Sequence, residues 1–269
     1  MLRFSLLSSG SAGNAILVDN GESKILIDNG LSFKELQARV SEIGESLDTL
    51  EAVLVTHEHG DHVKGIGVLS RQRSIPTYIT PATFSALNPK IGAIDPLHHF
   101  DSGETLTLGS YSITSFRVSH DAADPVSFVV ECNGSRLGLA TDLGKATHLV
   151  RKRLQNCHAL VLESNYCHEM IRNSPYPPAI IQRIRSNMGH LSNADMNSLL
   201  DDLLHDDLQW VVAVHVSKEN NSEDLVREMA ERVLKNHAAK LIVADQERPS
   251  PMYTIEPAMT LPEASAANL

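Results

Sequence analysis

The chain has 269 residues, 42% of them hydrophobic and 21% charged, with 23 basic against 33 acidic side chains and a net charge of −10. These proportions are typical of a soluble globular protein and exclude a disordered chain or a collagen. No apolar run approaches the roughly 20 residues that span a bilayer, so a membrane bundle is also excluded. The three cysteines form no Cys-x-x-Cys pair, and the N-terminus makes a poor signal peptide, so we expect a cytoplasmic protein without a membrane partner.

Short strand-like runs dominate the first half of the chain, and helices alternate with strands in the second half. Turn signals such as Asn20-Gly21, Asn29-Gly30 and Asn133-Gly134 separate the early runs. In chain order we predict strands at FSLL, AILVD, KILID, AVLVT, TLTL, SITSFRV, VSFVVE and RLGLAT, and then at 159–163, 210–215 and 240–244. The predicted helices span about 32–43, 61–74, 144–154, 176–187, 192–206 and 222–238.

Strands and helices are mixed throughout, and no Pro/Ser-rich linker divides them. This pattern indicates one α/β domain over residues 1–255, built on sheets with helices outside. From about Glu256 the segment EPAMTLPEASAANL loses its periodicity, and we expect residues 256–269 to form a disordered tail.

The strongest chemical signal is the segment THEHGDH at residues 56–62, which follows the apolar run AVLVT and opens a helix. His57 and His59 are two residues apart in the loop and can converge on one metal ion. Asp61 and His62 begin the helix and can turn toward a second ion. Imidazole and carboxylate ligands without thiolate suit zinc, manganese or iron, and they do not fit a structural Cys-rich zinc site.

Three later residues are candidate ligands because each is a histidine or aspartate at the end of an apolar run. They are His120, Asp142 and His215. At such a position the sheet fixes the backbone while the loop leaves the side chain free. Asp28 ends another run, KILID, and we interpret it as a carboxylate that holds a ligand histidine rather than as a ligand.

These residues resemble, in order and type, the five motifs of the metallo-β-lactamase superfamily over about residues 2–255. The resemblance implies a four-layer αββα sandwich with two divalent ions, zinc or manganese, at one edge of the paired sheets. By analogy the first ion takes His57, His59 and His120, the second takes Asp61, His62 and His215, and Asp142 bridges them. A hydroxide between the two ions would be the nucleophile.

Further segments narrow the resemblance to hydrolases of the phosphodiesterase branch. Asp142 replaces the cysteine of β-lactamases with a mixed site, and His59 replaces the glutamate typical of the redox branch. The segments ESNY at 163–166 and GHLSN at 189–193 resemble a motif that supplies a histidine beside the scissile phosphate. The resemblance thus assigns His190 to charge stabilisation or proton donation and Glu163 to orienting His190. We assign catalysis to Asp61, His190 and Glu163.

The chain is more similar still to the YycJ/WalJ family, whose members are described as metal-dependent exonucleases acting 5′ to 3′ on double-stranded DNA. The matching segments are SGSAGN at 9–14, HD at 120–121, DP at 124–125, TDLG at 141–144, ESNY, GHLSN and SKENN at 217–221. The family resemblance implies double-stranded DNA as substrate and partner. A ribonuclease is less expected, because the interval between Asp142 and His190 is too short for a β-CASP domain and lacks the Gly/Pro-rich arm of ribonuclease Z.

The segment 145–190 carries seven basic and two acidic residues in an otherwise acidic chain. It could follow a phosphate backbone, or it could simply form solvated helix faces. Tyr166 and Tyr176 within it could stack on a terminal base or pack in the ordinary way.

Two other functions stay open. A small-molecule hydrolase of the same fold would act on a cyclic phosphodiester, a thioester or a lactone, and the net charge of −10 modestly favours it. A catalytically idle regulatory module is disfavoured because every expected ligand position is filled. The sequence does not indicate an oligomeric state.

Overall fold

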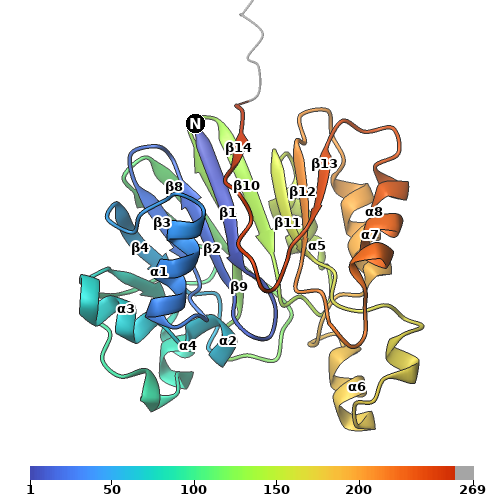
Figure 1. The fold of residues 1–269 in the computed structure, drawn as a ribbon, viewed down its shortest axis with the longest axis horizontal. Coiled ribbons are helices and arrows are strands. Elements are labelled where there is room, and N and C mark those ends of the chain that lie inside the picture. Colours follow the sequence, from blue (N-terminus) through green and yellow to red (C-terminus); the bar gives the residue numbers. More distant parts are fainter. Residues whose placement is uncertain (258–269) are drawn as a thin grey trace, which may run out of the picture.

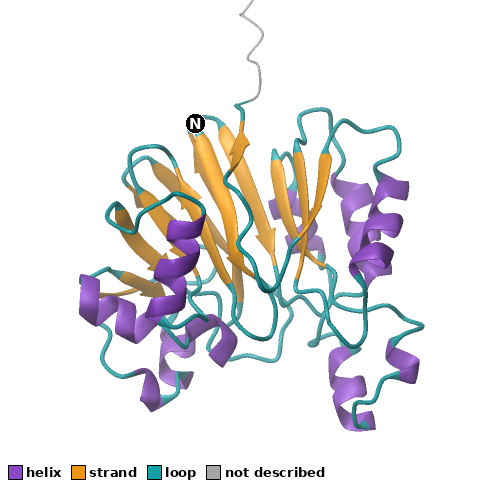
Figure 2. Cartoon of the chain, viewed as in Figure 1, coloured by secondary structure: helices purple, strands orange, loops and turns teal. Residues whose placement is uncertain are grey.

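Two seven-stranded sheets lie face to face at the centre of the molecule, with helices on their outer sides (Figure 1; Figure 2). The computed structural model describes residues 1–257. The first sheet has the strand order β14 (Tyr253–Ile255), β1 (Leu2–Ser8), β2 (Ala15–Asp19), β3 (Lys24–Ile27), β4 (Leu50–Leu54), β5 (Thr77–Ile79), β6 (Leu97–His99). The second has the order β13 (Lys240–Val243), β12 (Trp210–Val214), β11 (Ala159–Glu163), β10 (Ser135–Ala140), β9 (Val126–Cys132), β8 (Tyr111–Arg117), β7 (Thr105–Leu108).

The helices divide between the two sheets and the edge where the loops gather (Figure 1). On the side of the first sheet lie α1 (Phe33–Glu42) and α3 (Ile66–Arg73), and on the side of the second lie α5 (His148–Leu154), α7 (Asn193–Leu203) and α8 (Glu223–Val233). Toward the loop edge lie α2 (Gly60–Val63), α4 (Pro81–Ala86) and α6 (Pro178–Ile184). Two short 3₁₀ turns, Pro89–Ile91 and Ile171–Asn173, complete the described helices.

Apolar side chains fill three layers between these elements. The inner layer joins the two sheets and contains Phe4, Tyr111 and Phe128, all fully buried. One outer layer packs α1 and α3 on the first sheet, and the other packs α5, α7 and α8 on the second. A sheet that is covered on both faces explains the nearly continuous burial of strands such as β2 and β11. The arrangement confirms the predicted αββα sandwich.

The structure departs from the predicted elements in a few places. The expected helix over 61–74 is divided into α2 and α3 at Gly65, whose N–H donates to the Asn29 carbonyl. A Cβ on Gly65 would lie 2.0 Å from the Leu31 carbonyl oxygen, so this close backbone approach ends α2. The sequence pattern does not predict β5, β6 and β14, which have three residues each.

The ends of the described chain bear on two further expectations. Of the predicted tail, residues 258–269 lie outside the described residues. The single domain over 1–255 stays a prediction. No helix within residues 1–257 is long and apolar enough to cross a membrane.

The topology places the candidate ligands together. In the first sheet β3 runs parallel with β4, and in the second β10, β11 and β12 run parallel, and residues that follow the carboxyl ends of both sets meet at one edge. Strand β8 runs the same way as β10, since both are antiparallel to β9. Each predicted ligand follows one of these strand ends, so the sheets bring distant parts of the sequence to one site.

Candidate metal centre

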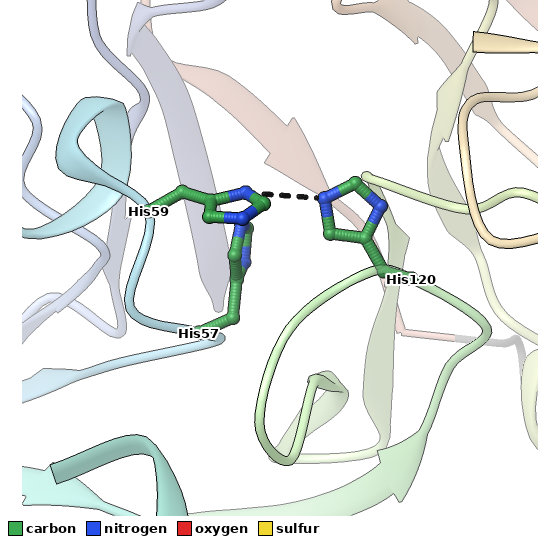
Figure 3. A group of neighbouring side chains, drawn as sticks. All are labelled: His57, His59 and His120. Atoms are coloured by element: carbon green, nitrogen blue, oxygen red, sulfur yellow. Dashed lines mark hydrogen bonds between the residues drawn. The ribbon is translucent and has the colours of Figure 1, made fainter. Parts of the chain in front are cut away.

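Three imidazoles converge at the open edge of the sandwich. His57 follows β4, His59 precedes α2, and His120 lies in the loop after β8 (Figure 3). His59 Nδ1 is 3.3 Å from His120 Nε2, and the ring centroids of His57 and His59 are 4.6 Å apart. His120 Nδ1 donates to the Gly189 carbonyl at 3.0 Å, which leaves Nε2 with its lone pair toward the other two rings. This is the trio that the resemblance assigns to a first ion.

A second group joins His62 to Asp142 and, on its other side, to Asp28. His62 Nδ1 donates to Asp28 Oδ2 at 2.7 Å, while its Nε2 lies 3.1 Å from Asp142 Oδ2. Thr56 also donates to both oxygens of Asp28 from its backbone N–H and its hydroxyl, at 2.8 and 2.7 Å. Asp28 therefore lies where a carboxylate can fix the tautomer and orientation of His62, with Nε2 left for a metal.

Glu163 occupies the centre of a third group. Its carboxylate is fully buried and accepts the N–H groups of Leu143 and Leu191 at 2.6 and 3.2 Å. Its Oε1 also lies 2.7 Å from His190 Nδ1 and 3.0 Å from His215 Nδ1. Glu163 thus holds two histidines at once, whereas the sequence led us to expect contact with His190 alone.

The grouping of the remaining predicted ligands differs from the analogy in two respects. His215 lies with Asp142, Glu163 and His190 as a possible metal-binding group, and Asp142 Oδ1 is 3.3 Å from His215 Nδ1. Asp61 belongs to none of the three groups found among the described residues. Its carboxylate accepts from Asn14 at 3.2 Å and lies 3.6 Å from His62 Nε2.

Two buried polar atoms test whether this site fits a metal ion. His57 Nε2 and Asp142 Oδ2 are shielded from solvent, and within residues 1–257 neither forms a hydrogen bond of acceptable geometry, although Asp142 Oδ2 lies 3.1 Å from His62 Nε2. An unpartnered buried polar atom is costly, and an imidazole nitrogen and a carboxylate oxygen are the ligand types that zinc and manganese accept. His57, His62 and Asp142 present ligand atoms within 4.8 Å of one another. The site therefore fits a divalent cation.

Electrostatics divide the histidines into two kinds. Burial, reinforced by the neighbouring His62, holds the pKa of His57 well below its ordinary value, and burial also lowers the pKa of His120. Both rings are therefore neutral near pH 7, as metal ligation requires. Burial likewise opposes the charged form of His215, but Asp142 and Glu163 outweigh it and raise the pKa of His215 to about 9. Asp142 and Asp28 hold the pKa of His62 well above its ordinary value against the same effect of burial.

Three site residues adopt a backbone conformation that L-residues rarely take. Asp28, Asp142 and His215 have φ values of 60°, 50° and 56°, each directly or closely after a strand end. Each such residue costs on the order of 1–3 kcal/mol, and strain of this kind gathers at functional sites. The left-handed conformation therefore marks Asp28, Asp142 and His215 as residues whose backbone the fold constrains at the site.

Two further residues contact the site in ways that were not predicted from the sequence. Asn14 Nδ2 lies 3.0 Å from His62 Nε2, so the SGSAGN segment contacts the centre as well as forming a turn. Arg183 on α6 pairs with Asp121, the residue after His120, and brings a guanidinium to the rim. The signals in the sequence were only indirect, because Asn14 is the last residue of the matching segment SGSAGN and Arg183 belongs to the basic segment 145–190.

The turn at Gly30 offers a direct test of how tightly the centre is built. A Cβ on Gly30 would lie 1.7 Å from the Asp61 carbonyl oxygen, whereas a Cβ on Gly60 would meet no atom within 4 Å. We expect Gly30→Ala to displace the start of α2 and to lower kcat/KM on the order of 10²-fold, since a 1 Å misplacement costs about this much. Gly60→Ala is the matched control. Equal metal content and activity in both variants would contradict the tight packing of α2.

Comparison with known proteins identifies the family. Residues 23–215 match the beta-lactamase superfamily domain. Exodeoxyribonuclease YycJ of Bacillus anthracis is 37% identical over 236 residues, which cover 87% of this chain and 89% of the relative. Exodeoxyribonuclease WalJ of Streptococcus pneumoniae is 34% identical over 242 residues, 88% of each chain.

Solved structures agree on the fold. The metallo-beta-lactamase fold protein YhfI from Bacillus subtilis has a TM-score of 0.71 at 16% identity, covering 93% of this chain and 99% of that protein. A diphosphatase of the PhnP family has a TM-score of 0.63 at 15% identity, covering 94% and 98%. The chain therefore belongs to the beta-lactamase superfamily and, within it, to the YycJ/WalJ family, and it is a metal-dependent hydrolase.

Proposed function

We propose that the protein is a metal-dependent exonuclease that degrades double-stranded DNA from the 5′ end. The names of its relatives YycJ and WalJ support a DNA substrate. The observation that carries the proposal is the pair His190 and Glu163 beside the metal-binding groups. His190 Nδ1 is held by Glu163, and no described residue forms a hydrogen bond to its Nε2, so this nitrogen stays free for a substrate oxygen.

The proposed centre holds two ions, as the family resemblance implies. We assign the first to His57, His59 and His120 and the second to Asp61, His62 and His215, with Asp142 shared between them. Asp142 lies within 3.1 and 3.3 Å of His62 and His215, which supports a shared role. A bound pair of divalent ions supplies the charge that lowers the pKa of an attacking water and offsets charge on the phosphate oxygens.

The chain's own residues then orient the substrate and move the proton. Asp28 and Glu163 fix the tautomers of His62 and His215 by accepting their Nδ1–H groups. His190 Nε2 gives a proton to the leaving oxygen or donates a hydrogen bond to the phosphate in the transition state. The Arg183 guanidinium at the rim can exchange its Asp121 partner for a phosphate oxygen of the strand.

The metal requirement gives the first direct test. We expect chelation to abolish cleavage and added Mn²⁺ or Zn²⁺ to restore it. Below pH 9 an ion must displace the proton on His215, so its apparent affinity should weaken as the pH falls from 8 to 6. Metal content and cleavage of duplex DNA labelled at the 5′ end, the 3′ end or internally measure both effects. Undiminished cleavage by protein shown to contain no metal would refute the proposal.

The acidic surface supports a second candidate, a hydrolase of small phosphodiesters, thioesters or lactones. With a net charge of −10 the whole molecule repels a polyanion, and only the local basic segment counters this. The same assay separates the candidates when a generic phosphodiester and an RNA hairpin are run in parallel. Stepwise release of nucleotides from the 5′ end of the duplex supports the exonuclease. Turnover of the small ester alone is consistent with the metal centre but shows that DNA is not the substrate.

A further inference from the structure

A hollow with a volume of about 370 Å³ lies beside the metal centre. Gly144 and Leu191 line it, and they directly continue the segments that carry Asp142 and His190. Consecutive Cα atoms are about 3.8 Å apart, so the wall of the hollow begins within roughly 8 Å of the backbone of both residues. A Cβ on Gly144 would lie 2.4 Å from the Asn187 carbonyl oxygen, which shows how closely the two segments join.

Positive charge gathers around this hollow. Lys145 and Arg185 line it and are exposed, and neither forms an ion pair within residues 1–257. Arg151 also lines it but is paired with Asp202. The one carboxylate among the lining residues, Asp195, accepts the Ser192 hydroxyl at 2.6 Å. Free cations concentrated at one hollow of an acidic protein favour an anionic ligand.

A phenolic hydroxyl adds a specific donor. Tyr166 lines the hollow and is only 4% exposed as a residue, and no hydrogen bond to its hydroxyl occurs among the described residues. Burial raises its pKa, so the hydroxyl keeps its proton and can donate it. Its backbone is fixed by the N–H of Asn193, which donates to the Tyr166 carbonyl at 2.9 Å. The buried ring cannot stack on a terminal base, which corrects one of the two roles considered for Tyr166.

We propose that this hollow binds a phosphate group of the substrate strand other than the one being cleaved, through Lys145, Arg185 and the Tyr166 hydroxyl. The proposal rests on the nucleic-acid substrate of the proposed function. Ammonium, guanidinium and phenolic O–H groups are all donors, and they match a phosphate's acceptor oxygens. The nearness of Asp142 and His190 places such a phosphate within a few nucleotides of the metal centre, because phosphates of one strand recur about every 3.4 Å along the duplex axis.

Binding to metal-free protein tests the hollow independently of cleavage. The probes are one duplex with a 5′-phosphate and the same duplex with a 5′-hydroxyl, measured by fluorescence anisotropy over a range of salt concentrations. We expect the K145A/R185A double variant to bind at least tenfold more weakly than wild type, with the salt slope reduced by about 1 for each cation removed. Tyr166→Phe keeps the ring and removes the hydroxyl, and should weaken binding severalfold without changing the salt slope.

The matched control is Lys152→Ala, which removes an exposed cation of α5 that does not line the hollow. If K152A and the double variant lose equal affinity for the duplex, binding reflects only general electrostatic attraction and the proposal is overturned. Unaltered binding by the double variant would also overturn it. If the double variant loses affinity only for the 5′-phosphorylated duplex, the ligand of the hollow is the terminal phosphate. If it loses affinity equally for both duplexes, the ligand is an internal phosphodiester. If wild type binds with these properties but cleaves no DNA, the proposed function fails while the hollow stands.

Discussion

Asp142→Asn is expected to lower kcat/KM for the nuclease substrate on the order of 10³-fold or more and to reduce the metal content. Asp142 touches both His62 and His215, at 3.1 and 3.3 Å, and its Oδ1 is 3.7 Å from His120 Nε2. Asparagine keeps the shape of the side chain but removes the negative charge that attracts a cation. The measurement combines elemental analysis of the purified variant with its cleavage rate at saturating Mn²⁺.

The matched control is Asp48→Asn, which makes the same chemical change at an exposed carboxylate paired with Arg73 and remote from the site. We expect this variant to cleave as wild type does. Thermal unfolding of both variants separates a lost metal site from a lost fold. A D142N protein that folds, keeps the wild-type metal content and cleaves within tenfold of wild type would show that Asp142 is no metal ligand.

Much of the architecture followed from the sequence because the strands of the sandwich are apolar runs ended by turn residues. Runs such as AILVD and VSFVVE became β2 and β9 with almost fully buried patterns. The three-residue strands β5, β6 and β14 escaped prediction because so short a run carries too little periodicity to be recognised. Their pairing depends on neighbouring strands that only the folded sheet brings alongside.

Some features of the candidate site could likewise be predicted from the sequence, and others could not. The gathering of histidine and aspartate side chains at one edge could be predicted, because parallel strands deliver their carboxyl ends to one edge. The contact of Glu163 with His215 could not, since it joins the last residue of β11 to the residue that follows β12, and these strands pair only in the folded sheet. The ion pair of Arg183 with Asp121 depends in the same way on how α6 lies against the loop after β8.

His190→Ala is expected to lower kcat about 10²- to 10⁴-fold, the range usual for a lost general acid, with the metal content unchanged. Glu163→Gln is expected to lower kcat as well, because it removes the charge that orients His190. It should also weaken metal binding 10- to 100-fold, because Glu163 Oε1 lies 3.0 Å from His215 Nδ1 as well as 2.7 Å from His190 Nδ1. Steady-state kinetics with metal titrations measure both quantities for each variant.

This pair of variants separates chemistry from metal binding within one group of side chains. Asp142, Glu163, His190 and His215 could themselves hold an ion, and in that case His190→Ala would lose metal as readily as Glu163→Gln. If His190 is instead a proton donor, the two variants differ: His190→Ala keeps its metal, whereas Glu163→Gln binds metal more weakly. A pH profile adds a second criterion, because loss of a general acid removes the alkaline limb of kcat while loss of an orienting carboxylate only shifts it. The exposed His148 provides the control substitution, His148→Ala, which removes an imidazole at the start of α5 and should change neither quantity.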